Sequence, residues 1–164
     1  MGLRALTDIR PFRPNDLPAI VSLWTAAWQA TLPSIDFSAR QPWLEQHLRA
    51  LDGAGILILC AVDEADGPRG FATLDLTSGE MDQLAVAPDA FGQGVADALI
   101  EAVKRRAPGR IRLTVNQDNP RAMAFYRRAG FTIVAAGANP HSGLRTWEMA
   151  WVIAPASAAS PAGG

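Results

Sequence analysis

The sequence predicts a mixed α/β fold of the α+β class, with a mostly antiparallel central sheet of about seven strands flanked by helices on both faces. Two observations carry this prediction. Short runs that alternate apolar and polar residues recur along the chain and are separated by turn residues, as in antiparallel hairpins. One amphipathic helix follows the strand that ends at Val86, and such a helix joins parallel neighbours by a right-handed crossover. We therefore expect the element order β-α-α-β-β-β-α-β-α-β-β.

Length and composition are those of one domain with a single core. The chain has 164 residues, a net charge of −1 and one cysteine, and a chain of this length forms one sizeable core. We expect the domain to span residues 1–153. Residues 154–164 contain only Ala, Ser, Pro and Gly. They lack bulky apolar side chains and are expected to form a flexible tail.

The same numbers exclude several classes of function. A net charge near zero argues against a broad basic surface for nucleic acid and leaves only a local basic patch open. A single cysteine forms no internal disulfide and no Cys-based metal site, which fits a reducing compartment. No apolar run reaches the length that spans a membrane, and no signal peptide opens the chain. We expect a cytoplasmic protein without a metal and without nucleic-acid or membrane partners, and a homodimer is left open.

The first elements expected are an edge strand and a helix. Residues 7–12 alternate as a strand does, and Pro11 is tolerated only at the edge of a sheet. Asn15 or Asp16 is expected to cap the helix. Its apolar stripe consists of Leu17, Ile20, Val21, Trp24 and Trp28.

A second helix is expected after a break at residues 31–34. It spans roughly residues 38–51, and Pro42 is the point at which this helix kinks or restarts. We expect His47 on the outer face of the helix, away from any site.

A hairpin follows the second helix. Residues 55–62 form a strongly apolar run that is typical of a buried strand, residues 63–69 form the turn, and residues 70–76 form the partner strand. Cys60 lies in the apolar strand. It is expected to be a core thiol and not a nucleophile.

A strand, a glycine turn and the start of a helix follow at residues 81–99. Leu84 and Val86 alternate as strand residues do. The apolar positions of the helix are Val95, Ala98, Leu99, Ala102 and Val103. Gly92 and Gly94 let backbone N–H groups approach a ligand closely, where a helix presents its unpaired N–H groups and positive dipole end. This arrangement predicts an anion site, most often one for phosphate.

The C-terminal third predicts a strand, a short helix and a final hairpin. Residues 110–115 alternate as a half-buried strand. A helix of about ten residues is expected between Asn119, a natural N-terminal cap, and Gly130, a C-terminal cap. Residues 131–136 and 145–153 are expected to form the hairpin.

Residues 80–131 carry two motifs in a defined order. The first is Leu84-x-Val86-x-Pro88 followed by Gly92-x-Gly94-x-Ala96. The second is Asn116-x-x-Asn119-x-x-Ala122-x-x-Phe125-Tyr126-x-x-x-Gly130-Phe131. Together they resemble the motifs of the GNAT family of acyl-CoA-dependent N-acetyltransferases. The resemblance implies the GNAT fold, in which two central parallel strands splay apart and the pantetheine arm of the cofactor enters the gap.

The resemblance also implies a site for acetyl-CoA or coenzyme A as co-substrate. Backbone N–H groups of the phosphate loop would cradle the diphosphate, and this loop consists of Phe91, Gly92, Gln93, Gly94, Val95 and Ala96. The strand formed by Leu84, Ala85 and Val86 would pair with the pantetheine arm and polarise the thioester oxygen through the backbone groups of its first and last residues. Asn119, with Asn116 from the same motif, would hold the arm from the other side.

Phe91 departs from the family pattern. GNAT proteins usually have Gln or Arg at this position of the phosphate loop. The main-chain contacts need no side chain there, so we expect the diphosphate to bind, but with lower affinity.

The resemblance assigns Tyr126 to protonate the departing thiolate of CoA. Considered alone, a helix tyrosine is more often a core residue with a buried ring and a hydrated hydroxyl.

For the general base, Glu80 and Asp82 are expected on one face of the strand that leads to Leu84, because side chains alternate with period two. The alternative for both carboxylates is a solvated strand end. His141, in the last hairpin loop, is the reserve candidate.

The implied reaction is transfer of an acetyl group from acetyl-CoA to a primary amine by direct attack in a ternary complex. We expect a small-molecule amine, with Trp24, Trp28 and His141 as candidate substrate-binding residues. Core packing is the more frequent role of such tryptophans. Two alternatives stay open: a non-catalytic acyl-CoA-binding or sensing module, and acetylation of a protein N-terminus or lysine. Tyr126 and the carboxylates favour an enzyme, because a pure binder needs neither.

Overall fold

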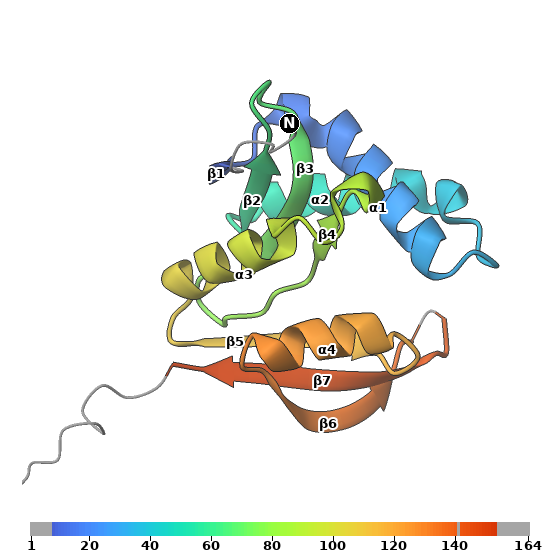
Figure 1. The fold of residues 1–164 in the computed structure, drawn as a ribbon, viewed down its shortest axis with the longest axis vertical. Helices are drawn as coiled ribbons and strands as arrows, with labels where there is room; N and C mark the ends of the chain where they lie inside the picture. The colour runs from blue at the N-terminus through green and yellow to red at the C-terminus, as the bar shows by residue number, and fades with distance from the viewer. Residues whose placement is uncertain (1–7, 141, 154–164) are drawn as a thin grey trace, which may run out of the picture.

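Two antiparallel sheets form the framework of the protein in the computed structural model, which describes residues 8–140 and 142–153 (Figure 1). The first sheet has the order β1-β2-β3-β4 and the second the order β5-β7-β6. The strands of the first sheet are β1 (Asp8–Pro11), β2 (Leu57–Val62), β3 (Pro68–Leu74) and β4 (Leu84–Val86). Those of the second are β5 (Arg110–Asn116), β6 (Thr132–Ala138) and β7 (Arg145–Val152). The predicted fold class is therefore confirmed.

Helices pack on both faces of the first sheet, as predicted. The helices are α1 (Leu17–Thr31), α2 (Gln41–Gly53), α3 (Val95–Arg106) and α4 (Pro120–Arg128), with 3-10 turns η1 (Pro14–Asp16), η2 (Phe37–Arg40) and η3 (Pro88–Ala90). In Figure 1, α3 lies in front of the first sheet, α1 and α2 lie behind it, and α4 crosses in front of the second sheet. One continuous core joins all these layers and includes Ile20, Phe71, Leu99 and Phe131. None of the helices in the described ranges is long and apolar enough to cross a membrane.

The second predicted helix is divided in two. The 3-10 turn η2 ends at Arg40, and α2 begins at Gln41 with Pro42 in its first turn. Proline is tolerated there because the first turn of a helix leaves its N–H groups unpaired. Pro42 therefore restarts the helix, which is one of the two predicted outcomes.

Among the described residues, one isolated backbone bridge joins the chain that leads into β4 to the second sheet. Glu80 forms an isolated parallel bridge with Arg112. The Met81 N–H donates to the Arg112 carbonyl at 2.8 Å, and the Arg112 N–H donates to the Gly79 carbonyl at 3.0 Å. Beyond this bridge β4 pairs with β3, and β5 pairs with β7. The strands on either side of α3 thus diverge, which opens the gap expected between the central parallel strands.

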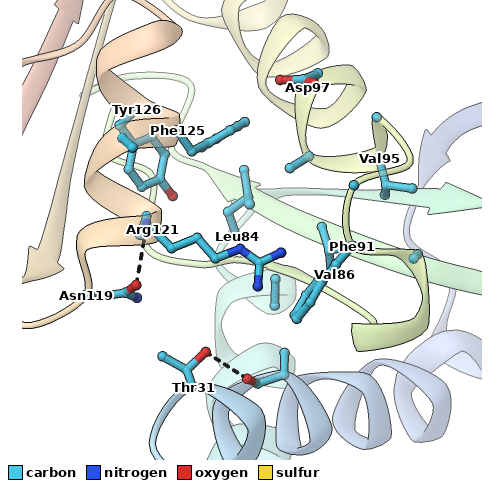
Figure 2. A pocket seen from close by; sticks show the side chains of 18 of the residues that line it. Thr31, Leu84, Val86, Phe91, Val95, Asp97, Asn119, Arg121, Phe125 and Tyr126 are labelled. Atoms are coloured by element: carbon cyan, nitrogen blue, oxygen red, sulfur yellow. Dashed lines mark hydrogen bonds between the residues drawn. The ribbon is translucent and has the colours of Figure 1, made fainter.

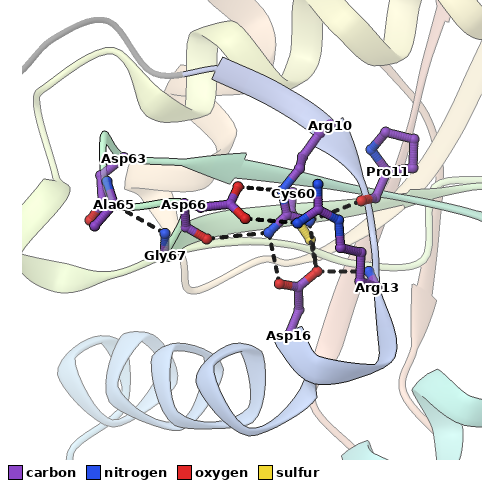
Figure 3. A network of polar contacts seen from close by, with 9 residues as sticks. All are labelled: Arg10, Pro11, Arg13, Asp16, Cys60, Asp63, Ala65, Asp66 and Gly67. Atoms are coloured by element: carbon purple, nitrogen blue, oxygen red, sulfur yellow. Dashed lines mark hydrogen bonds and ion pairs between the residues drawn. The ribbon is translucent and has the colours of Figure 1, made fainter.

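An ion-pair network fixes β1 against the turn between β2 and β3 (Figure 3). The two terminal nitrogens of Arg10 each donate to one carboxylate oxygen of Asp16 at 2.8 Å, and its Nε donates to Asp66 at 2.7 Å. Asp16 occupies the N-cap position of α1, as predicted, but its side chain makes no capping bond to that helix. It accepts instead from the backbone N–H of Arg13. The bonds from Arg10 hold the pKa of Asp16 below its usual range.

Cys60 lies beside this network and is the core thiol that the sequence predicted. It is completely buried in β2, and its Sγ lies 3.8 Å from Asp16 Oδ2. Burial raises the pKa of Cys60 to about 12. A thiol that stays protonated at neutral pH is a poor nucleophile.

We expect Asp16→Ala to destabilise the fold by about 3 kcal/mol, because it removes the buried, two-bond partner of the largely buried Arg10 guanidinium and leaves only the half-exposed carboxylate of Asp66. The control is Asp66→Ala, which removes a half-exposed carboxylate and should cost much less. The folded-state pKa of Asp16 is lowered, so its contribution is present above the unfolded-state pKa of about 3.9 and is lost as the pH falls further. Denaturant unfolding at pH 7 and below pH 4 measures both effects. Equal losses for the two variants would contradict the role given to Asp16.

Candidate active site

A cavity of about 540 Å³ opens between α1, β4, the loop after β4, α3 and α4 (Figure 2). Its lining residues fall within residues 27–31, 84–97 and 119–128. The second range holds the first predicted motif, and the third range holds the central part of the second motif. The fold therefore brings both motifs to the walls of one cavity.

β4 presents a free backbone edge to this cavity. Ala85 pairs with β3, and its neighbours Gln83 and Ala87 also hydrogen-bond to β3 through their backbones. Because backbone groups of alternate strand residues point to the same side, the N–H and C=O groups of Leu84 and Val86 point away from β3. Leu84, Ala85 and Val86 all line the cavity. An extended ligand could therefore add to β4 as a further strand.

The glycine turn leaves the N-terminus of α3 open. Gly92 and Gly94 have φ angles of +80° and +82°, in the left-handed region that favours glycine. A Cβ atom at either position would meet no described atom within 4 Å. The N–H groups of the first turn of α3 have no partner within the helix, and its residues from Val95 to Asp97 line the cavity. This is the geometry of the predicted anion site.

Tyr126 points its hydroxyl into the cavity from α4 (Figure 2). Phe125 and Phe131 pack edge-on against its ring, with centroid separations of 5.1 and 5.4 Å, so the ring is held in place. None of the described residues hydrogen-bonds to the hydroxyl. Burial raises the pKa of Tyr126, which keeps the phenol protonated and able to donate at neutral pH.

Three of the residues predicted to bind the cofactor are less accessible from the cavity than the others. Gln93 does not line the cavity, and its backbone N–H, the group expected to hold the diphosphate, donates to the Ala90 carbonyl at 3.2 Å. Asn116 is the last residue of β5 and also lies outside the lining. Asn119 does line the cavity, but its side-chain oxygen accepts from the Ala122 N–H at 3.2 Å. It therefore caps α4, as predicted, and its amide nitrogen is left to donate to a ligand.

Glu80 and Asp82 are exposed and flank the buried Met81, so the predicted alternation holds. They do not lie on a regular strand, because Glu80 forms only the isolated bridge and β4 begins at Leu84. Neither side chain lines the cavity. The reserve base, His141, lies outside the described residues.

His47 is partly exposed, and it makes a contact that the sequence did not predict. Its Nε2 lies 2.6 Å from Asp82 Oδ2, and its ring stacks on Trp43 with a centroid separation of 4.8 Å. The contact joins α2 to the chain that leads into β4, two segments far apart in the sequence. The pattern of apolar and polar residues in α2 does not predict the contact between His47 and Asp82.

The two predicted substrate-wall tryptophans have different environments. Trp28 lines the cavity and stacks on Phe37 at 5.6 Å. Trp24 is 4% exposed and lies outside the lining, with its Nε1 donating to Gln83 Oε1 at 3.2 Å. Trp24 is therefore a core residue, because the helical stripe that it shares with Ile20 faces the sheet.

Several lining residues were not predicted from the sequence. They include Thr31, Asp97, Arg121, Phe125 and Arg128. The guanidinium of Arg121 lies 4.1 Å from the centroid of the Phe91 ring. One local signal was present: Arg121 stands in the first turn of α4, where the helix dipole disfavours a cation.

The part of the chain described by the structure contains no group of three or more His, Cys, Asp and Glu side chains that could hold a metal ion. The expectation of a metal-free site stays a prediction.

Comparison with known proteins matches residues 17–131 to the family model described as the acetyltransferase (GNAT) family. The chain is 30% identical over 128 residues to the peptidyl-lysine N-acetyltransferase YjaB of Salmonella typhimurium, covering 78% of this chain and 85% of that protein. It superposes on the solution structure of apo-form YjaB from Escherichia coli with a TM-score of 0.73 and 28% identity, covering 91% and 99% of the two chains. A mycothiol acetyltransferase of Acidothermus cellulolyticus is 41% identical over 91 residues, which cover 52% of this chain and 28% of that protein.

Proposed function

Because this chain belongs to the GNAT family of acetyltransferases, we propose that it transfers an acetyl group from acetyl-CoA to a primary amine by direct attack in a ternary complex. One observation carries this proposal. The free edge of β4, the open N-terminus of α3 and the hydroxyl of Tyr126 face one cavity. An acyl-CoA needs a strand-like partner for its arm, an anion site for its diphosphate and a proton for its thiolate.

The residues present fit acetyl-CoA. The N–H groups at the start of α3 and the left-handed turn at Gly92 and Gly94 would hold the diphosphate. The free backbone groups of Leu84 and Val86 would pair with the amides of the pantetheine arm and polarise the thioester carbonyl. The amide nitrogen of Asn119 would approach from the opposite wall.

Tyr126 would complete the chemistry at the sulfur. The amine nitrogen forms a bond to the thioester carbon, the carbon–sulfur bond breaks, and the sulfur leaves with the electron pair. The phenol of Tyr126 then supplies a proton to this thiolate. Burial raises the pKa of Tyr126, so the phenol is protonated at neutral pH and can donate to the sulfur as negative charge develops on it.

We propose Glu80 or Asp82 as the group that removes the proton from the acceptor, directly or through a water molecule. Of the two, Asp82 has a partner that can carry a proton, because His47 Nε2 lies 2.6 Å from its Oδ2. His141 remains the reserve candidate. The base is needed because a lysine-like amine has a pKa of about 10.4 and is mostly protonated at pH 7.

Replacing the true base by its amide should lower the rate of acetyl transfer most at low pH, where the fewest acceptor amines are already deprotonated. The measurement is the rate of Glu80→Gln and Asp82→Asn between pH 6 and pH 9. An added His47→Gln variant tests whether the imidazole acts with Asp82. If both amide variants keep the wild-type rate over this range, neither carboxylate is the base.

We propose a protein lysine as the first candidate acceptor. The support is the similarity to the peptidyl-lysine N-acetyltransferase YjaB, of which this chain covers 85%. The small-molecule amine that the sequence analysis expected is the second candidate, supported by the mycothiol acetyltransferase, of which only 28% is covered. Both acceptors present a primary amine to the same thioester.

A release assay for the CoA thiol separates these candidates. Purified protein and acetyl-CoA are mixed with lysine peptides, with peptides that carry a free N-terminus, and with small amines. A lysine acetyltransferase releases thiol with peptides whose only free amine is the lysine side chain. Release with small amines alone would favour the second candidate. No release with any acceptor, in protein that binds acetyl-CoA, would favour the non-catalytic binding module.

A further inference from the structure

The phosphate loop of this cavity contains no cationic side chain. Residues 91–96 are Phe, Gly, Gln, Gly, Val and Ala, and Phe91 occupies the position at which GNAT proteins usually have Gln or Arg. Backbone N–H groups can hold a diphosphate, but they supply only partial charges. A full positive charge beside this dianion must come from another part of the chain.

Arg121 reaches the loop from α4, on the opposite wall of the cavity. Its guanidinium carbon lies 4.1 Å from the centroid of the Phe91 ring, and both side chains line the cavity. Figure 2 shows the side chain extended from α4 across the cavity toward Phe91. The contact is a cation–π interaction, which holds a guanidinium over a ring and leaves its N–H groups free to donate at the edge.

Arg121 is not neutralised by an acid. The ion pairs found among the described residues do not include it, although Asp97 lines the same cavity. It stands in the first turn of α4, where the positive end of the helix dipole repels it. The N-terminus of α3 adds a second positive dipole end to the cavity. An arginine kept there without an acidic partner suits an anionic ligand.

We propose that Arg121 binds the diphosphate of coenzyme A and that Phe91 positions it, in place of the polar side chain that usually opens this loop. This inference rests on the proposed function, because it requires CoA in the cavity. The presence of Phe91 would then not cost the protein a phosphate contact. The positive charge beside the diphosphate would come from Arg121 of α4 and not from a side chain of the loop.

The first test measures the affinity for CoA and for dephospho-CoA by calorimetry. Dephospho-CoA keeps the diphosphate and lacks only the 3′-phosphate. Arg121→Ala should weaken both ligands by about 10- to 100-fold, the range for a hydrogen bond to a charged group. The matched control is Arg127→Ala, which removes an exposed arginine of the same helix outside the lining. The control should leave both affinities unchanged.

The second test asks whether Phe91 acts through Arg121. Phe91→Leu should weaken CoA binding in the wild-type background and have little effect in the Arg121→Ala background, because the ring has then nothing to position. The double variant Phe91→Arg, Arg121→Ala returns the cation to the loop and should regain affinity over Arg121→Ala alone. A purely structural role of Phe91 would lower affinity equally in both backgrounds.

The outcomes separate the inference from the proposed function. If the wild-type protein does not bind CoA, the proposed function fails. If the wild type binds and Arg121→Ala binds as well as Arg127→Ala, the role of Arg121 is wrong while the function stands. If Arg121→Ala weakens CoA but not dephospho-CoA, the arginine binds the 3′-phosphate and the assignment to the diphosphate is overturned.

Discussion

Tyr126→Phe should lower kcat by about 10²–10⁴-fold, the range for a single general acid, with little change in KM for acetyl-CoA. The phenylalanine ring still packs between Phe125 and Phe131, so the cofactor and the core are undisturbed. What is lost is a proton donated only as the thiolate forms, an interaction of the transition state. Steady-state kinetics with an acceptor found in the thiol-release assay provide the measurement.

The competing role of Tyr126 as a core residue makes a different prediction. If Tyr126 is only a core residue, Tyr126→Phe should lower the free energy of unfolding by no more than about 1 kcal/mol, and kcat should stay normal. Thermal melts and kinetics on the same preparation distinguish the two. A Phe variant with an unchanged kcat would remove Tyr126 from the mechanism and weaken the argument for an enzyme over a CoA-binding module.

Gly94→Glu should abolish the binding of CoA without unfolding the domain. Gly94 is the N-cap of α3, and a side chain there projects into open space where the diphosphate is expected. A glutamate adds bulk and a negative charge at the point where an anion must bind. Calorimetry with CoA should therefore detect no binding to this variant.

Gly94→Glu also strains the backbone, because Gly94 has a φ of +82° and any side chain is disfavoured there. A control must therefore separate the effect of this strain from the loss of CoA binding. Gly55 offers a matched control: it has the same φ of +82°, no described atom within 4 Å of a Cβ, and a place outside the cavity. Gly55→Glu should share the small loss of stability and keep wild-type affinity. Unchanged affinity in Gly94→Glu would remove the diphosphate from this turn.

The parts of the structure that the sequence predicted are those with local physical causes. The strand at β4, the glycine turn and the apolar stripe of α3 each follow from residues within a few positions of one another, and the structure confirms all three. The cap of α4 by Asn119 is of the same kind. The motifs could therefore be placed on the right elements before their positions in space were known.

The parts that were missed or wrong depend on contacts between distant segments. The carboxylate of Asp16 was predicted to serve a helix, but Arg10 of β1 offers a stronger, charged partner. The His47–Asp82 and Arg121–Phe91 contacts each join two elements whose own patterns are complete without them. Trp24 and Trp28 share one helical stripe, and only tertiary packing decides which of them reaches the cavity.

Acetyl transfer from acetyl-CoA in this cavity to an amine can be followed by intact-mass measurement of a synthetic peptide whose only free amine is one lysine, incubated with acetyl-CoA and protein. We predict one acetyl group on the peptide and one CoA thiol released for each, with the wild type and with Gly55→Glu but not with Gly94→Glu. If Gly94→Glu acetylated the peptide as well as the wild type does, the transfer would not depend on this cavity, and the proposed site would be wrong.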